Sequence, residues 1–259
     1  NHPETGLRIF HSIHHYGLDI TRAAFTGGGS LRPYLQAFGV DLFLSRSPDD
    51  AQEAIDGGIA AAVLYNPPRV NFKDSDKLRI AFDADAVVFS DESEAIYRRE
   101  GLTSFLTHEK DKAEEPLAEG PLANFLKKLS AVQKGYDPAE SPVRLAIVTA
   151  RNSPAHERVI KTLRAWGASV DEAFFLGGIS KDRVLEAFGA HIFFDDQEAH
   201  LAPASLSIPS ALVLYHTESV LRVEVPPAAQ TTTEPESAGK AAGELMDPKI
   251  DIADPPPEG

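Results

Sequence analysis

Short apolar runs alternate with amphipathic stretches along most of this chain. Buried parallel strands read as continuous apolar runs, and helices between them form the crossovers of a parallel sheet. The pattern therefore predicts an α/β fold, a parallel sheet flanked by helices. The runs expected as strands cover residues 7–13, 40–44, 59–64, 78–82, 143–148, 172–176, 190–194 and 211–215.

The stretches between these runs carry helix signals. Ser47 and Pro48 suit the start of a helix, and Leu122, Phe125 and Leu129 recur at helical spacing. Residues 109–120 are charged and contain proline, so they are expected as a connection. The expected helices cover residues 31–38, 47–55, 92–105, 121–132, 154–166 and 181–188.

The pattern divides the chain into three regions. Residues 1–77 are expected as an N-terminal α/β extension of the same globule, and residues 78–225 as the core. Residues at about 91–120 are expected as a mostly helical insertion in this core. Residues 226–259 hold seven of the 19 prolines and little apolar periodicity, so they are interpreted as a Pro-rich acidic tail.

Composition excludes several classes of function. The chain has no cysteine, which excludes disulfides, thiolate nucleophiles and Cys-ligated zinc. A formal net charge of -14 argues against binding to nucleic acid or to an anionic membrane. No apolar stretch reaches membrane-spanning length and no signal peptide is visible, so a cytoplasmic protein is expected. The chain begins at Asn1 and its only methionine is Met246, so the natural N-terminus is expected to lie outside it.

Polar side chains stand where the central apolar runs end. Ligands of α/β proteins bind beyond the carboxyl ends of the strands, so these side chains are expected to converge. Adjacent carboxylates repel each other unless a positive charge lies near, and oxygen ligands suit Mg²⁺. The set suits metal binding and phosphoryl transfer, as in a receiver domain or a phosphatase. Its members are Asp83, Asp85, Thr149, Lys181, Asp195 and Asp196.

Each of these positions also has a plainer interpretation. Asp-x-Asp is a common turn sequence, Thr149 could cap a helix, and Lys181 could be a solvated lysine. His200 is interpreted as a surface or packing residue. The same holds for three histidines near the N-terminus, which lack other ligands nearby: His11, His14 and His15.

The order of the motifs separates the two kinds of protein. Asp-x-Asp, Thr, Lys and Asp-Asp follow in the order of the haloacid dehalogenase superfamily, whereas receiver domains place an acidic pair first. Longer strings resemble the cytosolic 5'-nucleotidase type I family, and the likeness extends over most of residues 7–203. These strings lie at residues 17–28, 81–94, 148–158, 171–181 and 191–197.

The resemblance implies a haloacid-dehalogenase-like fold in which residues 78–225 form the catalytic core and the insertion at about residues 91–120 forms a small helical cap. It also implies hydrolysis of nucleoside 5'-monophosphates with Mg²⁺. It implies that Asp83 attacks phosphorus and that Asp85 protonates the leaving oxygen and then activates water. Thr149 and Lys181 would bind the phosphoryl oxygens. The implied metal ligands are Asp83 and Asp195, with Asp196 nearby and Asp85 through its backbone carbonyl.

Substrate contacts are harder to assign. Gly27 and Gly28 form a turn that can expose backbone N–H groups to an anion, although a purely structural loop explains them equally well. Arg151 follows Thr149 and is expected to face the cleft or to pack at a helix start. The full set of expected substrate contacts is Arg22, Thr26, Gly27, Gly28, Ala84, Ala150 and Arg151.

Two other functions stay open at this point. One is a phosphatase of the same fold for another small phosphomonoester, and the other is a non-catalytic regulator that binds a phosphate ligand. Asp85 argues against the regulator, because a binder needs no acid two residues after the nucleophile. A homo-oligomer that uses the C-terminal tail is a further hypothesis.

Overall fold

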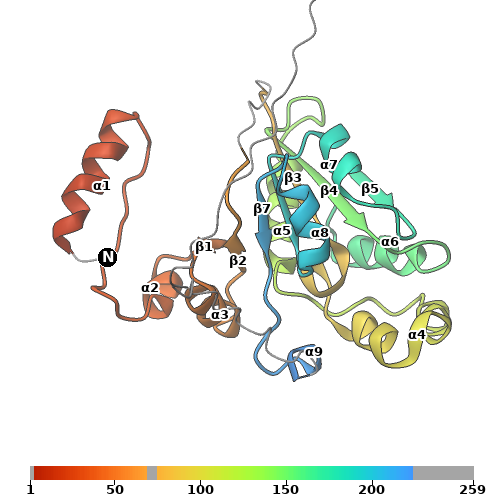
Figure 1. Ribbon diagram of the computed structural model, residues 1–259. Helices are drawn as coiled ribbons and strands as arrows, with labels where there is room; N and C mark the ends of the chain where they lie inside the picture. The colour runs from red at the N-terminus through yellow and green to blue at the C-terminus, as the bar shows by residue number, and fades with distance from the viewer. Residues whose placement is uncertain (1–2, 69–74, 224–259) are drawn as a thin grey trace, which may run out of the picture. The chain divides into compact units, whose positions relative to one another are not determined.

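A single seven-stranded sheet organises the part of the chain described by the computed structural model, residues 3–68 and 75–223 (Figure 1). Its strand order is β1-β2-β7-β6-β3-β4-β5, and neighbours are parallel except β2 and β7. The expected α/β fold, a mainly parallel sheet flanked by helices, is confirmed. The strands are Phe43–Ser45 (β1), Ala61–Leu64 (β2), Leu78–Phe82 (β3), Val143–Thr149 (β4), Glu172–Phe175 (β5), Ile192–Asp195 (β6) and Ser210–Leu212 (β7).

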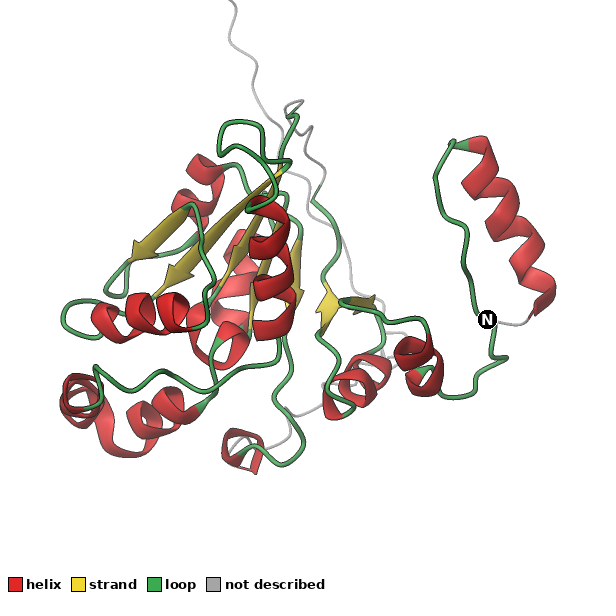
Figure 2. Cartoon of the chain, turned by 180° about the vertical axis from the view of Figure 1, so that it is seen from behind, coloured by secondary structure: helices red, strands yellow, loops and turns green. Residues whose placement is uncertain are grey.

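Helices cover both faces of the sheet (Figures 1 and 2). Alternate strand residues point to opposite faces, and two buried clusters follow this alternation. Phe82 and Ile147 belong to the cluster that includes residues of α5 and α6, whereas Ala81 and Val148 belong to the cluster with residues of α7 and α8. These helices are Ala123–Gln133 (α5), His156–Ala165 (α6), Asp182–Phe188 (α7) and Glu198–Ala204 (α8).

The N-terminal region joins the same sheet through the pairing of β2 with β7. A third buried cluster forms around Ala51, Ile55 and Ala61. The helices here are Pro3–His15 (α1), Arg32–Ala37 (α2) and Pro48–Asp56 (α3), and Val220–Val223 (α9) follows β7. The proposed domain boundaries stay predictions, and the predicted tail lies outside the described residues.

Two of the expected elements differ clearly from the sequence prediction, and helices α8 and α9 were not expected. Residues 7–13 were expected as a strand but lie within helix α1, where Leu7, Phe10 and Ile13 recur at intervals of three. The helix expected over residues 92–105 continues to Asp111 as α4 (Glu92–Asp111), although Gly101 breaks its geometry with a φ of 82°. The first three residues of the expected connection over 109–120 therefore lie in the last turn of a helix, whereas residues 112–120 lie outside it. None of the described helices is long and apolar enough to cross a bilayer.

Candidate functional site

Three neighbouring strands end at one edge of the sheet, and each delivers a polar side chain there. Asp83 follows β3, Thr149 ends β4 and Asp195 ends β6. The parallel registers of β3 with β4 and of β3 with β6 bring these residues to the same level. All three side chains are buried. The structure thus brings together positions that are up to about a hundred residues apart in the sequence.

Lys181 joins two of these carboxylates. It lies at the start of α7, and its Nζ is 2.9 Å from Asp83 Oδ1 and 2.6 Å from Asp195 Oδ2. Burial alone would lower the pKa of Lys181, but the two carboxylates raise it to about 12. Lys181 therefore stays charged, and the solvated lysine considered from the sequence does not describe it.

Asp83 and Asp195 differ in their protonation. Burial, reinforced by the charges of Asp195 and Asp85, raises the pKa of Asp83 to about 7 in spite of Lys181. Burial also acts to raise the pKa of Asp195, but hydrogen bonding with His200 and the charge of Lys181 bring it below the ordinary value. His200 Nδ1 is 3.2 Å from Asp195 Oδ2, so this histidine contacts the site although a surface or packing role was expected for it.

Asp196 is also buried, and one of its oxygens is unsatisfied. The hydroxyl of Tyr215 donates a hydrogen bond to Asp196 Oδ2, whereas Oδ1 has no partner among the described residues. Burial and the charges of Asp83 and Asp195 raise the pKa of Asp196 well above its ordinary value. A buried carboxylate oxygen without a partner is costly, which is a sign that a ligand belongs there.

These charges fit a divalent cation. When ionised, Asp83, Asp195 and Asp196 carry three negative charges against the single positive charge of Lys181. Oxygen donors suit Mg²⁺, and a cation would lower the cost of gathering buried carboxylates. Asp83, Asp195 and His200 each offer a ligand atom, and these atoms lie within 4.8 Å of one another. The residues present therefore fit the metal that the sequence predicted.

Asp85 is held by a different partner. Arg151 Nε and Nη2 donate to the two carboxylate oxygens of Asp85 at 2.8 and 2.6 Å, and Arg151 Nη1 donates to Glu109 Oε2. The guanidinium of Arg151 also lies 5.3 Å from the centre of the Phe105 ring. Burial would lower the pKa of Arg151, but Asp85 and Glu109 raise it above the ordinary value.

Thr149 keeps a donor available for a ligand. Its Oγ1 accepts the backbone N–H of Arg151 at 3.2 Å, so the hydroxyl proton can point elsewhere. Thr149 is buried at the end of β4 and does not act as the N-cap of α6, which is Ala155.

A cavity of about 350 Å³ opens beside Asp85. Helix α4 contributes apolar and aromatic side chains to its wall, including Tyr97, Leu102 and Phe105. The loops that follow β4 and β5 also contribute residues to the wall, among them Ala150, Gly177 and Gly178, which have small side chains or none. The remaining lining residues are Asp85, Glu94, Arg151, Asn152, Gln197 and His200.

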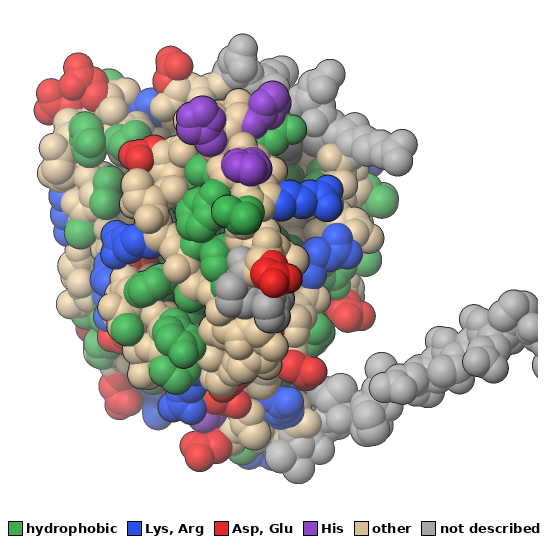
Figure 3. Space-filling view, turned by 90° about the vertical axis from the view of Figure 1, so that its left-hand side faces the viewer, with side chains coloured by type: hydrophobic (Ala, Val, Ile, Leu, Met, Phe, Trp, Pro, Cys, Tyr) green, Lys and Arg blue, Asp and Glu red, His purple; other side chains and the backbone are tan. Residues whose placement is uncertain are grey.

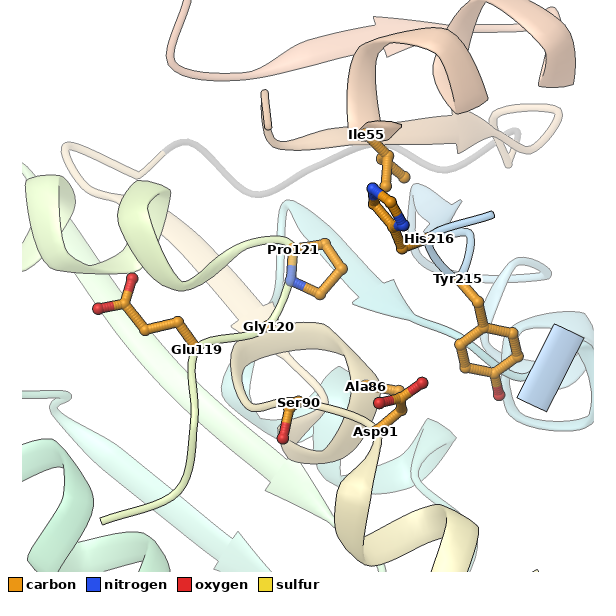
Figure 4. Close-up of a pocket in the computed structure, with 9 residues that line it drawn as sticks. All are labelled: Ile55, Ala86, Ser90, Asp91, Glu119, Gly120, Pro121, Tyr215 and His216. Carbon is orange, nitrogen blue, oxygen red and sulfur yellow. The ribbon is translucent and has the colours of Figure 1, made fainter. Parts of the chain in front are cut away.

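A second cavity of about 260 Å³ lies beside the turn that follows Asp83 (Figure 4). This turn, η1 (Ala84–Val88), contains Ala86 with a φ of 58°. Figure 4 shows Ile55 of α3 next to His216, and Tyr215 on the same segment as His216. Tyr215 therefore lines this cavity while its hydroxyl reaches Asp196.

The residues that line the larger cavity all come from residue 85 onward, so the expected contacts near the N-terminus are not among them. Thr26 Oγ1 donates to the carbonyl of Gly29, and Arg22, Gly27 and Gly28 are exposed. Ala150 and Arg151 do line the cavity, whereas Ala84 is fully buried. The substrate roles of these residues stay predictions.

Helix α1 presents exposed histidines. Figure 3 shows the molecule from the side of α1, with histidine and hydrophobic side chains gathered on that face. His11, His14 and His15 are exposed, in line with the surface interpretation. Within the described residues, the group suited to a metal is Asp83, Asp195 and His200, not this one.

Sequence reasoning missed three residues of this region: Glu109, Tyr215 and His200 as a partner of Asp195. Glu109 sits in a charged stretch that reads as solvated, yet it is 1% exposed. Tyr215 was placed only at the end of an expected strand. A histidine four residues after Asp196 was the one usable signal, since a helix that begins after the motif turns it back toward the strand end.

Sequence comparison finds relatives over most of the chain. A family profile described as 5'-nucleotidase matches residues 1–220. Human cytosolic 5'-nucleotidase 1B is 40% identical over 209 residues, which cover 79% of this chain and 34% of that protein. The chain therefore spans about a third of the length of this curated relative.

Structural comparison finds two distant likenesses among its matches. A structure from Pseudomonas aeruginosa UCBPP-PA14 that bears the name universal stress protein has a TM-score of 0.35 and 11% identity, over 83% of this chain and 78% of that one. A HAD-superfamily hydrolase from Geobacter sulfurreducens PCA has a TM-score of 0.28 and 14% identity, over 54% of this chain and 89% of that one. At TM-scores below 0.5, neither likeness bears on the function.

Proposed function

The chain belongs to the 5'-nucleotidase family, and on this premise we propose that it hydrolyses nucleoside 5'-monophosphates to nucleoside and phosphate. The observation that carries the proposal is the group of Asp83, Lys181 and Asp195 at one edge of the sheet, beside a cavity with aromatic walls. Because the curated relative is much longer, its activity is a proposal for this chain and not a finding.

In the proposed first step, a carboxylate oxygen of Asp83 attacks phosphorus and forms an aspartyl-phosphate. The bond between phosphorus and the 5'-oxygen breaks. Asp85, whose two oxygens accept hydrogen bonds from Arg151 in this structure, takes up a proton before this step and gives it to the departing oxygen. Lys181 and Thr149 donate hydrogen bonds to the phosphoryl oxygens, whose charge they offset in the transition state.

In the second step, water attacks the phosphorus of the aspartyl-phosphate. Asp85, which lost its proton in the first step, accepts a proton from this water. The bond between phosphorus and the Asp83 oxygen breaks, which returns the carboxylate and releases phosphate. Asp85 has thus regained its proton at the end of the cycle.

The proposed metal is Mg²⁺. Asp83 and Asp195 would hold it, with Asp196 close by and the backbone carbonyl of Asp85 as a further ligand. The metal would supply positive charge that lowers the repulsion between the Asp83 carboxylate and the phosphate. Oδ1 of Asp196 has no hydrogen-bond partner in the described part of the chain, and this atom and the excess of buried negative charge support the assignment.

The nucleoside would occupy the cavity beside Asp85. Tyr97, Leu102 and Phe105 offer apolar surface for a base or ribose, and Asn152 and Gln197 offer polar groups that could fix its orientation. The relative is named as cytosolic, and we propose the same compartment for this chain.

The test is phosphate release from a panel of nucleoside monophosphates and sugar phosphates, with Mg²⁺ and with EDTA. We expect hydrolysis of nucleotides that requires the metal. Asp83→Asn should lower the rate by at least about 10³-fold, because the nucleophile is lost while the shape is kept. Activity in EDTA, preference for sugar phosphates or full activity of the variant would overturn the proposal.

A further inference from the structure

We propose that Glu109 is a positioning residue that, through Arg151, fixes the carboxylate of Asp85 toward the cavity. This inference rests on the proposed function, in which Asp85 is the acid and base. It assigns the inserted helix α4 a part in the reaction beyond covering the site. It also gives Arg151 a role other than the substrate contact expected from the sequence.

The first support is the way in which Glu109 divides its two oxygens. Oε2 accepts from Arg151 Nη1, whereas Oε1 accepts from Arg158 Nη1 at 2.9 Å and from the Ser93 hydroxyl at 2.8 Å. One oxygen is thus used for the packing of α4 and α6, and the other reaches toward Asp85 through a single arginine.

The second support is that Arg151 has little capacity left for a ligand. Its Nε and Nη2 bind Asp85, and its Nη1 binds Glu109 and, at 3.3 Å, the carbonyl of Ala155. Phe105, also on α4, lies against the guanidinium. Glu109, the Ala155 carbonyl and the Phe105 ring thus hold the planar guanidinium in place. Because Arg151 binds Asp85 through two parallel hydrogen bonds, it also fixes the plane of that carboxylate.

The third support is the gradient of burial along this chain of contacts. The side chain of Glu109 is 0% exposed, that of Arg151 2% and that of Asp85 16%. Glu109 and Arg151 are therefore almost completely buried. Arg151 and Asp85 both line the cavity, and Asp85 is the member whose side chain is most exposed to it. A reactive group held by buried partners is what an acid with a fixed orientation needs.

The charges in this network balance without any ligand. Glu109 and Asp85 are paired with Arg151 and Arg158, so the two negative and two positive groups compensate each other. Without Glu109, Arg151 would keep its pair with Asp85. Arg158 would keep, among the carboxylates of the described residues, only the more distant pair with the partly exposed Glu92, 3.9 Å away. The arrangement of this network therefore depends on Glu109 more than on a ligand bound in the cavity.

The test compares two substrates that differ in how much their leaving group needs an acid. A nucleoside 5'-oxygen leaves as an alkoxide and requires a proton, whereas p-nitrophenolate leaves without one. The readout is release of the leaving group in the first turnover, which isolates the step in which Asp85 acts as the acid. Asp85→Asn provides the reference: it should slow the first turnover of the nucleotide but not that of p-nitrophenyl phosphate.

Glu109→Gln keeps the shape but can offer its amide oxygen to only one of the two arginines. Arg151→Lys keeps the charge but cannot bind Asp85 through two parallel hydrogen bonds. We expect each to slow the first turnover of the nucleotide by about 10- to 100-fold and that of p-nitrophenyl phosphate by less than about threefold. KM for the nucleotide should change less than kcat.

Arg158→Lys is the matched control. It disturbs the same buried network at the other oxygen of Glu109, so it should lower the thermal midpoint but leave the ratio of the two substrates unchanged. Equal losses on both substrates in Glu109→Gln and Arg151→Lys, or no loss in either, would overturn the proposal and leave Glu109 a structural residue.

The outcome also separates this inference from the proposed function. If the unaltered protein releases p-nitrophenolate but not nucleoside, the substrate class is wrong, and the alkyl phosphomonoester that it does hydrolyse replaces the nucleotide in the same comparison. If it hydrolyses no phosphomonoester, both proposals fall.

Discussion

Two buried groups of charged residues meet at the same edge of the sheet, and they differ in their balance of charge. The Lys181 cluster consists of Asp83, Lys181, Asp195 and Asp196, with three acids to one base. The Glu109 network consists of Asp85, Glu109, Arg151 and Arg158, with two acids to two bases.

The difference indicates what each group is for. A buried set whose charges compensate can hold its geometry by itself, although breaking it is costly. A set with excess negative charge and an unpartnered oxygen needs something positive. The Lys181 cluster is thus suited to binding and reaction, and the Glu109 network to keeping neighbouring groups in place.

The largest effect is expected from loss of the single base in the Lys181 cluster. Lys181→Met keeps much of the side-chain volume but removes the ammonium that lies between Asp83 and Asp195. We expect kcat/KM for a nucleoside monophosphate to fall by about 10³-fold, because charge in the transition state loses its fixed donor. Steady-state kinetics at saturating Mg²⁺ measure this.

Lys127→Met provides the comparison. Lys127 also pairs with an acid, Glu119 at 2.6 Å, but the pair lies at the surface, and such pairs contribute little. Its kcat/KM should stay within about twofold of the unaltered protein. A similar fall in both variants would show that Lys181 acts through general stability and not at the site.

The next effect concerns stability without metal. Asp83 has a folded pKa of about 7, above the value of about 3.9 in an unfolded chain. Between these values the folded state binds more protons than the unfolded state, so the free energy of unfolding falls as pH rises. In EDTA we expect a loss on the order of a few kcal/mol between about pH 4 and pH 7.

Thermal or denaturant unfolding at pH 5 and pH 7.5 tests this expectation. Added Mg²⁺ should stabilise the protein far more at the higher pH, where a larger share of Asp83 is ionised. Asp83→Asn, which carries no charge, should be more stable than the unaltered protein in EDTA at pH 7.5. If stability in EDTA rises over this range, the excess charge of the Lys181 cluster does not control how stability depends on pH.

The Lys181 cluster was largely predictable because its acids and Thr149 follow apolar strands. The carboxyl ends of parallel strands meet at one edge, so a polar residue at each end has a predictable neighbourhood. To predict where Asp83, Thr149 and Asp195 lie, it was enough to recognise the buried strands that they follow. What the sequence could not show was that Tyr215 would contact Asp196, whereas the contact of His200 with Asp195 had a signal in its spacing from the motif.

The Glu109 network was not predictable in the same way. Its members lie on a turn, a loop and two helices, and pairing between distant charged side chains has no local signature. Charged residues are usually exposed, so residues 109–120 were interpreted as a connection, whereas Glu109 lies in the interior. The strand predicted over residues 7–13 was wrong for a related reason, since a short apolar run fits either a strand or one face of a helix.

The smallest effect is expected at Tyr215, which lies between the Lys181 cluster and helix α4. Its hydroxyl donates to Asp196 Oδ2, and Arg98 Nη2 of α4 donates to the same hydroxyl at 3.1 Å. Tyr215→Phe keeps the ring but frees Asp196, so the Mg²⁺ concentration for half-maximal activity should rise about tenfold, with kcat at saturation within about twofold. Tyr136→Phe, at an exposed tyrosine, should change neither quantity. If Tyr215→Phe lowers kcat and leaves the Mg²⁺ requirement unchanged, Asp196 acts in the reaction and not in holding the metal.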